Sequence, residues 1–113
     1  MENREIAIKT GEILSAKKAG QVIVLGIAEQ SSFADFFVNA TAMNERQLMA
    51  LTDEVEDQLS KDALIPKNIE GKPSSGWILM DYGDIVVNIF LPQQRDLYQL
   101  EKIWSDGEFI AIE

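Results

Sequence analysis

Apolar residues at helical spacing predict a helix near the start of the chain, from residue 4 to residue 18. Asn3 precedes this segment, and an asparagine side chain commonly caps the first turn of a helix. Gly20 follows it, and glycine tolerates the left-handed backbone that ends many helices. We therefore expect Asn3 and Gly20 to bound the helix. Its apolar face consists of Ile6, Ile13 and Leu14.

Two further helices are predicted from the same periodicity. Asn44 opens the stronger one, with Gln47 three positions later in a variant of the capping box. This helix is expected to end near residues 60–62. The last helix is expected to start at Pro92 and to stop at Gly107. The two apolar faces consist of Leu48, Leu51, Val55 and Leu59, and of Leu97, Leu100, Ile103 and Trp104.

Runs of apolar and β-branched residues predict the strands of a sheet. Residues 22–28 are almost continuously apolar, which indicates a strand buried on both faces. A second run extends from about Asp35 to residue 42. Residues 77–80 and 85–91 flank a Tyr-Gly centre, which is typical of a β-hairpin. Shorter strands are expected at Ile69 and at residues 109–112. The order of elements predicts an α/β or α+β fold, with a mixed β-sheet flanked by helices.

The predicted hairpin has two different faces, because side chains alternate across a strand. One face carries an indole, an aliphatic chain and a carboxylate in line, which suits a basic and partly apolar protein surface. Tryptophan is enriched at interface hot spots and is also a common core residue, so both roles stay open. The first face consists of Trp77, Leu79 and Asp81, and the second of Ile78, Met80 and Tyr82.

Composition narrows the possible functions. The chain has 113 residues, so we expect one domain over residues 1–113. It contains no Cys and no His, which excludes a Cys/His zinc site, a cysteine nucleophile and a Ser-His-Asp triad. Ten Lys and Arg against nineteen Asp and Glu give a net charge of −9. Such a surface repels phosphate, so we expect neither direct nucleic-acid binding nor binding to an anionic membrane.

The first residues are polar and mixed in charge, unlike a secretory signal. The longest apolar run, residues 22–28, is too short to span a bilayer. We therefore expect a cytoplasmic protein.

Carboxylates are the remaining candidates for chemistry. Asp81 and Asp84 flank the predicted turn at a spacing that could share a cation, although aspartate is frequent in turns for backbone reasons alone. Asp35 lies in apolar surroundings, where we expect hydrogen bonds to anchor it. The chain contains no phosphate-binding glycine motif. We therefore expect no catalytic residue, metal or cofactor.

Three blocks of the chain carry recognisable motifs in order. Residues 33–47 contain Phe-Ala-Asp-Phe-Phe-Val, Ala-Thr and Arg-Gln. Residues 70–87 contain Glu-Gly and then Gly-Trp-Ile-Leu-Met-Asp-Tyr-Gly-Asp-Ile-Val-Val. The third block carries Arg95, Tyr98, Leu100, Glu101 and Trp104. Together, over about residues 3–106, the chain resembles the Iojap family of bacterial ribosomal silencing factors.

The resemblance implies a mixed sheet related to nucleotidyltransferases but without their catalytic carboxylates. It implies binding to the large ribosomal subunit at its intersubunit face, through the ribosomal protein called number fourteen. Binding there would block joining of the small subunit and repress translation. The resemblance assigns partner contacts to Trp77, Ile78 and Asp81, to which we add the adjacent Tyr82 and Asp84. Family members are monomers or dimers, so a homodimer is an open alternative.

The chain departs from the family pattern in three places. Asn88 stands where histidine is usual, so a role that needs an imidazole is lost. Phe36 replaces a tyrosine, and residues 42–44 replace Gly-Thr-Ser. Two rival functions remain: a nucleotidyltransferase-like, metal-dependent enzyme that uses Asp81 and Asp84, and a dimeric protein-interaction module.

Overall fold

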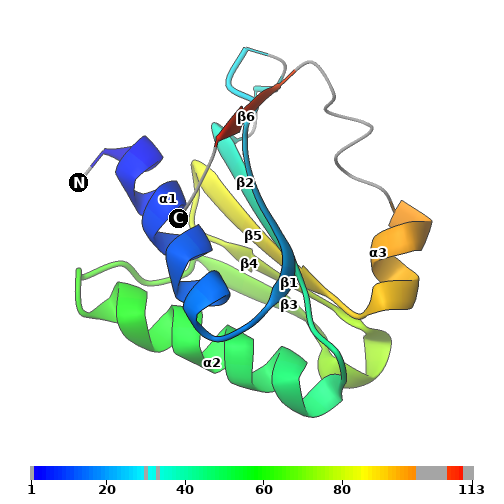
Figure 1. Ribbon diagram of the computed structural model, residues 1–113. Helices are drawn as coiled ribbons and strands as arrows, with labels where there is room; N and C mark the ends of the chain where they lie inside the picture. Colours follow the sequence, from blue (N-terminus) through cyan, green and yellow to red (C-terminus); the bar gives the residue numbers. More distant parts are fainter. Residues whose placement is uncertain (1, 30, 33, 99–106, 111–113) are drawn as a thin grey trace.

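A mixed six-stranded sheet forms the centre of the molecule (Figure 1). The computed structural model describes residues 2–29, 31–32, 34–98 and 107–110. The strand order is β3-β4-β5-β2-β1-β6, in which β2 and β5 are parallel and the other neighbours are antiparallel. The predicted mixed sheet is therefore confirmed. Its strands are β1 (Gly20–Gly26), β2 (Phe36–Thr41), β3 (Asn68–Lys72), β4 (Trp77–Asp81), β5 (Ile85–Phe90) and β6 (Glu108–Ile110).

Helices cover both faces of this sheet, as predicted (Figure 1). The helices α1 (Asn3–Ala16) and α2 (Glu45–Ser60) lie on one face, and α3 (Pro92–Tyr98) lies on the other. The larger apolar core fills the space between α1, α2 and the sheet. A smaller cluster on the opposite face consists of Leu25, Ile27, Ala34, Phe37 and Val86. No helix in the described ranges is long and apolar enough to cross a membrane.

The start of α1 differs from the prediction. Its cap is Glu2, whose backbone N–H donates to Glu5 Oε1 at 3.2 Å. Asn3 is instead the first helical residue. The prediction that Asn3 caps the helix was wrong because its amide is used in a long-range contact, described below.

The end of α1 also differs. The last helical residue is Ala16, and Lys18 takes the left-handed backbone with φ 67°. The N–H of Ala19 then donates to the carbonyl of Leu14 at 3.0 Å, which is the bond of a helix-ending Schellman turn. Gly20, expected to end the helix, is instead the first residue of β1.

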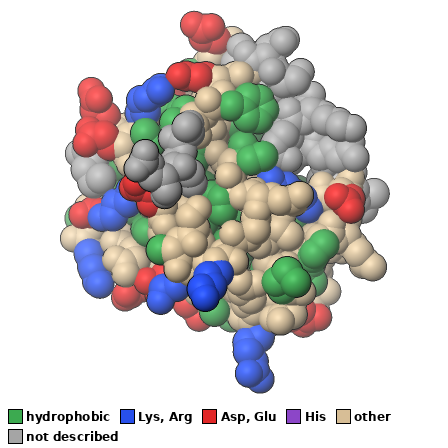
Figure 2. All heavy atoms as spheres, in the orientation of Figure 1, with side chains coloured by type: hydrophobic (Ala, Val, Ile, Leu, Met, Phe, Trp, Pro, Cys, Tyr) green, Lys and Arg blue, Asp and Glu red, His purple; other side chains and the backbone are tan. Residues whose placement is uncertain are grey.

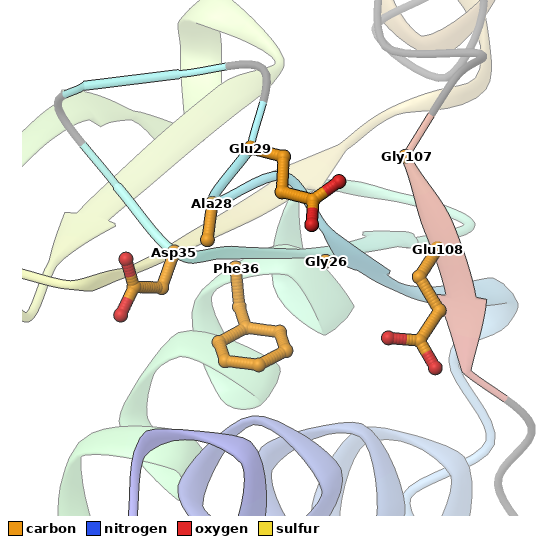
Figure 3. A pocket seen from close by; sticks show the side chains of 7 residues that line it. All are labelled: Gly26, Ala28, Glu29, Asp35, Phe36, Gly107 and Glu108. Carbon is orange, nitrogen blue, oxygen red and sulfur yellow. The ribbon is translucent and has the colours of Figure 1, made fainter.

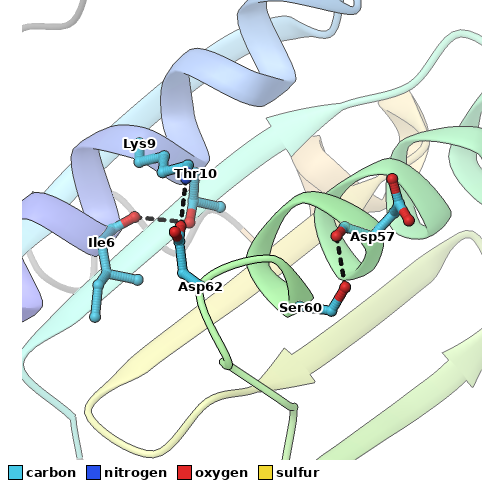
Figure 4. A network of polar contacts seen from close by, with 6 residues as sticks. All are labelled: Ile6, Lys9, Thr10, Asp57, Ser60 and Asp62. Carbon is cyan, nitrogen blue, oxygen red and sulfur yellow. Dashed lines mark hydrogen bonds and ion pairs between the residues drawn. The ribbon is translucent and has the colours of Figure 1, made fainter. Parts of the chain in front are cut away.

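The predicted cap of α2 is confirmed. Asn44 Oδ1 accepts from the N–H of Gln47 at 2.8 Å, and Gln47 Oε1 accepts from the N–H of Met43 at 2.6 Å. At the other end of α2, Lys9 of α1 forms an ion pair with Asp62 (Figure 4). The two helices are therefore joined by a charged contact as well as by apolar packing.

A buried arginine holds α3 on the sheet. Arg95 is 6% exposed, and its guanidinium donates to Thr41 Oγ1 at 3.1 Å and to the carbonyl of Gln21 at 2.8 Å. The start at Pro92 is as predicted. The predicted continuation to Gly107, with Leu100, Ile103 and Trp104, lies outside the described residues.

Candidate protein-binding site

Strand β4 has one buried and one partly exposed face, as predicted from its alternation. Ile78 and Met80 are 2% and 0% exposed and lie in the larger core. Trp77, Leu79 and Asp81 are partly exposed on the opposite face. We call the surface formed by these three residues and the adjoining Glu70 of β3 the outer face. The indole and the carboxylate named from the sequence therefore share an accessible surface.

The indole of Trp77 is held in one orientation. Its Nε1 donates to Asn88 Oδ1 at 3.0 Å, and its ring stacks on Phe90 with centroids 5.2 Å apart and an interplanar angle of 29°. Asn88 is 1% exposed and in turn donates through Nδ2 to Asn39 Oδ1 at 3.0 Å. The tryptophan is thus neither sealed in the core nor fully solvated. It is anchored to the sheet by its polar edge.

A hollow of about 270 Å³ adjoins this indole. Its walls come from β4, from β3 and from the short 3₁₀ turn η1 (Pro73–Ser75) that joins them. Register places Glu70 of β3 directly opposite Leu79 of β4. A carboxylate therefore stands beside two apolar side chains at the edge of the sheet. The lining residues are Glu70, Gly71, Ser75, Trp77 and Leu79.

Close approach of β3 to β4 depends on a glycine. Gly71 has φ 92°, and a Cβ atom there would lie 2.1 Å from the carbonyl oxygen of Trp77. Any other residue would both strain the backbone and push the strands apart. The hollow therefore owes its shape to the absence of a side chain at this position.

The two aspartates of the turn after β4 form hydrogen bonds within the protein. Asp81 Oδ1 accepts from the N–H of Gly83 at 2.8 Å, and Gly83 has φ 90°. Asp84 Oδ2 instead accepts from Asn3 Nδ2 at 3.1 Å. Both aspartates line one hollow, but the Lys67 side chain lines it too, and its positive charge opposes cation binding. The geometry therefore gives the rival metal site of Asp81 and Asp84 no support.

Asn3 connects the start of α1 to two loops. Its Nδ2 donates to Asp35 at 3.2 Å as well as to Asp84. The carbonyl of Asp84 also accepts from the N–H groups of Asp35 and Phe36, at 2.7 and 3.0 Å. The expectation that hydrogen bonds anchor Asp35 is confirmed.

A second acidic hollow lies where β1, β2 and β6 meet (Figure 3). Figure 3 shows the carboxylate of Asp35 set apart from those of Glu29 and Glu108. Glu108 already accepts hydrogen bonds from both terminal guanidinium nitrogens of Arg4, at 2.9 and 3.0 Å, and this contact lowers its pKa. Across the residues that the structure describes, no three acidic side chains converge in a way that could hold a metal ion.

Two of the sequence-predicted site residues point away from the outer face. Ile78 packs in the core, so its side chain is not at the surface. Tyr82 also packs against the larger core, and its hydroxyl is buried without a hydrogen-bond partner. Burial, reinforced by the negative charge of Glu56, raises the pKa of Tyr82 to about 12. Trp77 and Asp81 remain on the outer face, with the exposed Asp84 beyond the turn.

Sequence reasoning missed Glu70 and Asn88 as parts of this site. Glu70 belongs to a recognisable motif, but only the pairing of β3 with β4 places it beside the indole. Asn88 follows an apolar run, and its spacing on β5 puts it on the face of Trp77 once the hairpin register is known. The sequence carries no local signal for either contact.

Charge on the surface is mixed in sign. Lys and Arg side chains on the face in Figure 2 are scattered among acidic ones and do not form one stripe. With a net charge of −9, the molecule as a whole favours a basic partner.

Comparison with known proteins supports the resemblance. A family model described as "Ribosomal silencing factor during starvation" (RsfS) matches residues 1–113. The "Ribosomal silencing factor RsfS" of Halalkalibacterium halodurans is 33% identical over 113 residues, which cover 100% of this chain and 97% of that protein. A mouse protein named "Mitochondrial assembly of ribosomal large subunit protein 1" is 26% identical over 102 residues, which cover 86% of this chain and 44% of that protein.

A solved structure has the same fold. The crystal structure of protein CV0518 from Chromobacterium violaceum superposes with a TM-score of 0.88 at 32% sequence identity, covering 99% of this chain and 92% of that one. The fold, the motifs and the full-length family match agree. The chain therefore belongs to the ribosomal silencing factor family, whose members are ribosome-associated regulatory proteins rather than known enzymes.

Proposed function

We propose that this protein binds the large ribosomal subunit, blocks joining of the small subunit by steric exclusion and so represses translation. Membership of the ribosomal silencing factor family supports a role at the ribosome. The name of the mouse relative points to the large subunit. The proposal needs neither a catalytic group nor a cofactor.

The contact is assigned to the outer face. Trp77 supplies an apolar anchor that is already held in place, and Asp81 and Asp84 add negative charge nearby. Ribosomal proteins are typically basic, so the partner surface would be complementary in charge. The resemblance to the Iojap family assigns that surface to the large-subunit protein number fourteen. Screening limits such attraction to roughly 8 Å at physiological salt, so packing around Trp77 must supply most of the affinity.

The molecule is large enough to exclude the small subunit sterically. Its principal extents are 34 × 32 × 27 Å. A standard interface uses about 800 Å² of each partner, which is roughly an eighth of the 6267 Å² surface here. Most of the body would therefore stay outside the contact and project into the space that the small subunit must enter.

The observation that carries the proposal is the half-buried, hydrogen-bonded Trp77 on an accessible sheet face. Its test is a subunit-joining assay with purified subunits, read by light scattering or by sedimentation of the joined particles. The wild-type protein should inhibit joining in a dose-dependent manner. Full joining at a saturating protein concentration would refute steric exclusion.

A variant pair locates the contact. Trp77→Ala should weaken binding to large subunits by about 2 kcal/mol or more, if the indole is the main anchor. Met49→Ala, which removes an exposed apolar side chain from α2 on the opposite face of the sheet, should bind normally. Circular dichroism checks that both variants fold. Normal binding by a folded Trp77→Ala variant would remove Trp77 from the contact.

Two remaining alternatives have separate tests. The homodimer stays a prediction. Light scattering of the protein without ribosomes measures its mass and decides between monomer and dimer. A nucleotidyltransferase-like enzyme would be stabilised against heat by a nucleoside triphosphate with Mg²⁺, and we expect no such shift.

A further inference from the structure

We infer that the hollow between β3 and β4 receives one arginine side chain of the partner, stacked on Trp77 and paired with Glu70. This inference rests on the proposed function and makes it specific. It also changes the expected charge pair from Asp81 to Glu70, a residue that the sequence did not single out for binding.

The walls of the hollow match the two parts of an arginine side chain. Trp77 and Leu79 form an apolar side, and Glu70 places its carboxylate on the neighbouring strand opposite Leu79. No basic side chain is among the lining residues. A guanidinium group is planar and weakly hydrated, so it can lie against an indole while it pairs with a carboxylate. A lysine ammonium lacks this planar surface and fits the site less well.

The carboxylate of Glu70 is partly oriented before any partner binds. Asn68 Nδ2 donates to Glu70 Oε2 at 2.9 Å on the same exposed strand. The indole is oriented as well, by Asn88 on its polar edge and by Phe90 across its ring. Phe90 lies on β5, whereas Glu70 lies on β3, so the two flank Trp77 from opposite sides of β4. Groups fixed in this way lose little conformational freedom on binding.

Asp81 is a weaker candidate for this pair. One of its carboxylate oxygens accepts from the N–H of Gly83 and holds the turn. It also lines a different hollow, which the Lys67 side chain shares. An arginine that stacks on Trp77 would therefore pair with Glu70, while Asp81 keeps its hydrogen bond in the turn.

The first experiment measures co-sedimentation with purified large ribosomal subunits over a range of salt concentrations. Glu70→Gln should weaken binding by about tenfold and flatten its dependence on salt. Asp53→Asn removes the same charge from an exposed position on α2, on the opposite side of the sheet, and should bind like the wild type. Lys72→Gln removes a positive charge from the residue paired with Trp77 and should bind at least as tightly as the wild type.

The second experiment identifies the partner residue. The chain has no cysteine, so Lys72→Cys can be labelled at a single position with a benzophenone photocrosslinker. Mass spectrometry of the crosslinked large subunits should find a ribosomal protein segment that contains an arginine. Replacing that arginine with glutamine should weaken binding of the wild type, and weaken binding of Glu70→Gln by clearly less, because only the stacking on Trp77 is then left to lose. Replacing it with lysine should recover only part of the affinity.

The outcomes separate this inference from the proposed function. If Trp77→Ala loses binding while Glu70→Gln binds like the wild type, the arginine pair is wrong and the proposed contact stands. If both variants bind like the wild type, the outer face itself is not the contact. Crosslinks confined to ribosomal RNA would also contradict the pairing of the partner's arginine with Glu70. So would losses of binding free energy that simply add when Glu70→Gln and the arginine replacement are combined.

Discussion

The indole N–H of Trp77 donates to the side-chain oxygen of Asn88 at 3.0 Å, so a buried amide fixes the orientation of a surface tryptophan. In the family pattern that the sequence resembles, the position of Asn88 is a histidine. A neutral imidazole nitrogen can accept the same hydrogen bond. The departure from the family pattern at this position is therefore compatible with the same support for the indole.

Replacing Asn88 tests this support. Asn88→Leu removes the acceptor of Trp77 and the donor to Asn39 Oδ1, so we expect a loss of about 2 kcal/mol in the free energy of unfolding. Binding to large subunits should weaken even under native conditions, where the variant is fully folded. Asn88→His should recover more of the binding than Asn88→Leu does. Equal binding by all three proteins would show that the hydrogen bond does not position the indole.

Tyr82 should make stability depend on pH in the alkaline range. Its pKa is about 12 in the folded protein against an ordinary value of 10.0, so the folded state holds the phenol proton more tightly than the unfolded chain. Between these two values the unfolded chain loses its proton first, and the free energy of unfolding falls as pH rises. Below this window the group contributes no pH dependence.

Tyr82→Phe removes this effect and an unpaired buried hydroxyl together. We expect the variant to be as stable as the wild type at neutral pH, or more stable by up to about 1 kcal/mol. Urea unfolding at about pH 8 and about pH 11, compared between the two proteins, measures both effects. A parallel decline of the two proteins over this range would assign the alkaline loss to other groups.

Arg95 should be needed to hold α3 on the sheet. Arg95→Ala leaves the buried Thr41 hydroxyl and the Gln21 carbonyl without this donor, at a cost of about 1–3 kcal/mol in the free energy of unfolding. Arg95→Lys should recover little, because an ammonium cannot reproduce the fork of the guanidinium. Arg46→Ala, at an exposed position on α2, serves as the control and should change stability by less than about 0.5 kcal/mol. Urea unfolding monitored by circular dichroism measures all three, and a wild-type midpoint for Arg95→Ala would contradict the assigned role.

Gly71 should be required for the edge of the sheet. Gly71→Ala places a Cβ atom 2.1 Å from the Trp77 carbonyl at a positive φ, so β3 must shift away from β4. We expect a loss of more than about 1 kcal/mol in stability and faster amide hydrogen exchange in β3. Gly20→Ala is the matched control, since its Cβ would meet nothing closer than 3.8 Å. Similar exchange rates in β3 for both variants would mean that the close approach is not essential.

Local sequence patterns were sufficient for most secondary structure. The cap of α2 at Asn44, the start of α3 at Pro92 and the hairpin around Gly83 all follow from signals within a few residues. The end of α1 did not, because Lys18 accepted a left-handed backbone that glycine usually takes, and Gly20 was used in β1 instead. Propensity is a weak guide where a turn is closed by several hydrogen bonds.

The sequence by itself determined the two faces of β4, because alternation along a strand needs only residues 77–81. It therefore placed Trp77 and Asp81 together correctly. Only the tertiary structure decided that Glu70 lies beside the indole, that Asn88 holds it and that Asn3 joins Asp35 to Asp84. These contacts join residues up to 81 positions apart, and they depend on strand register and helix packing, which the whole chain sets together and no local motif encodes.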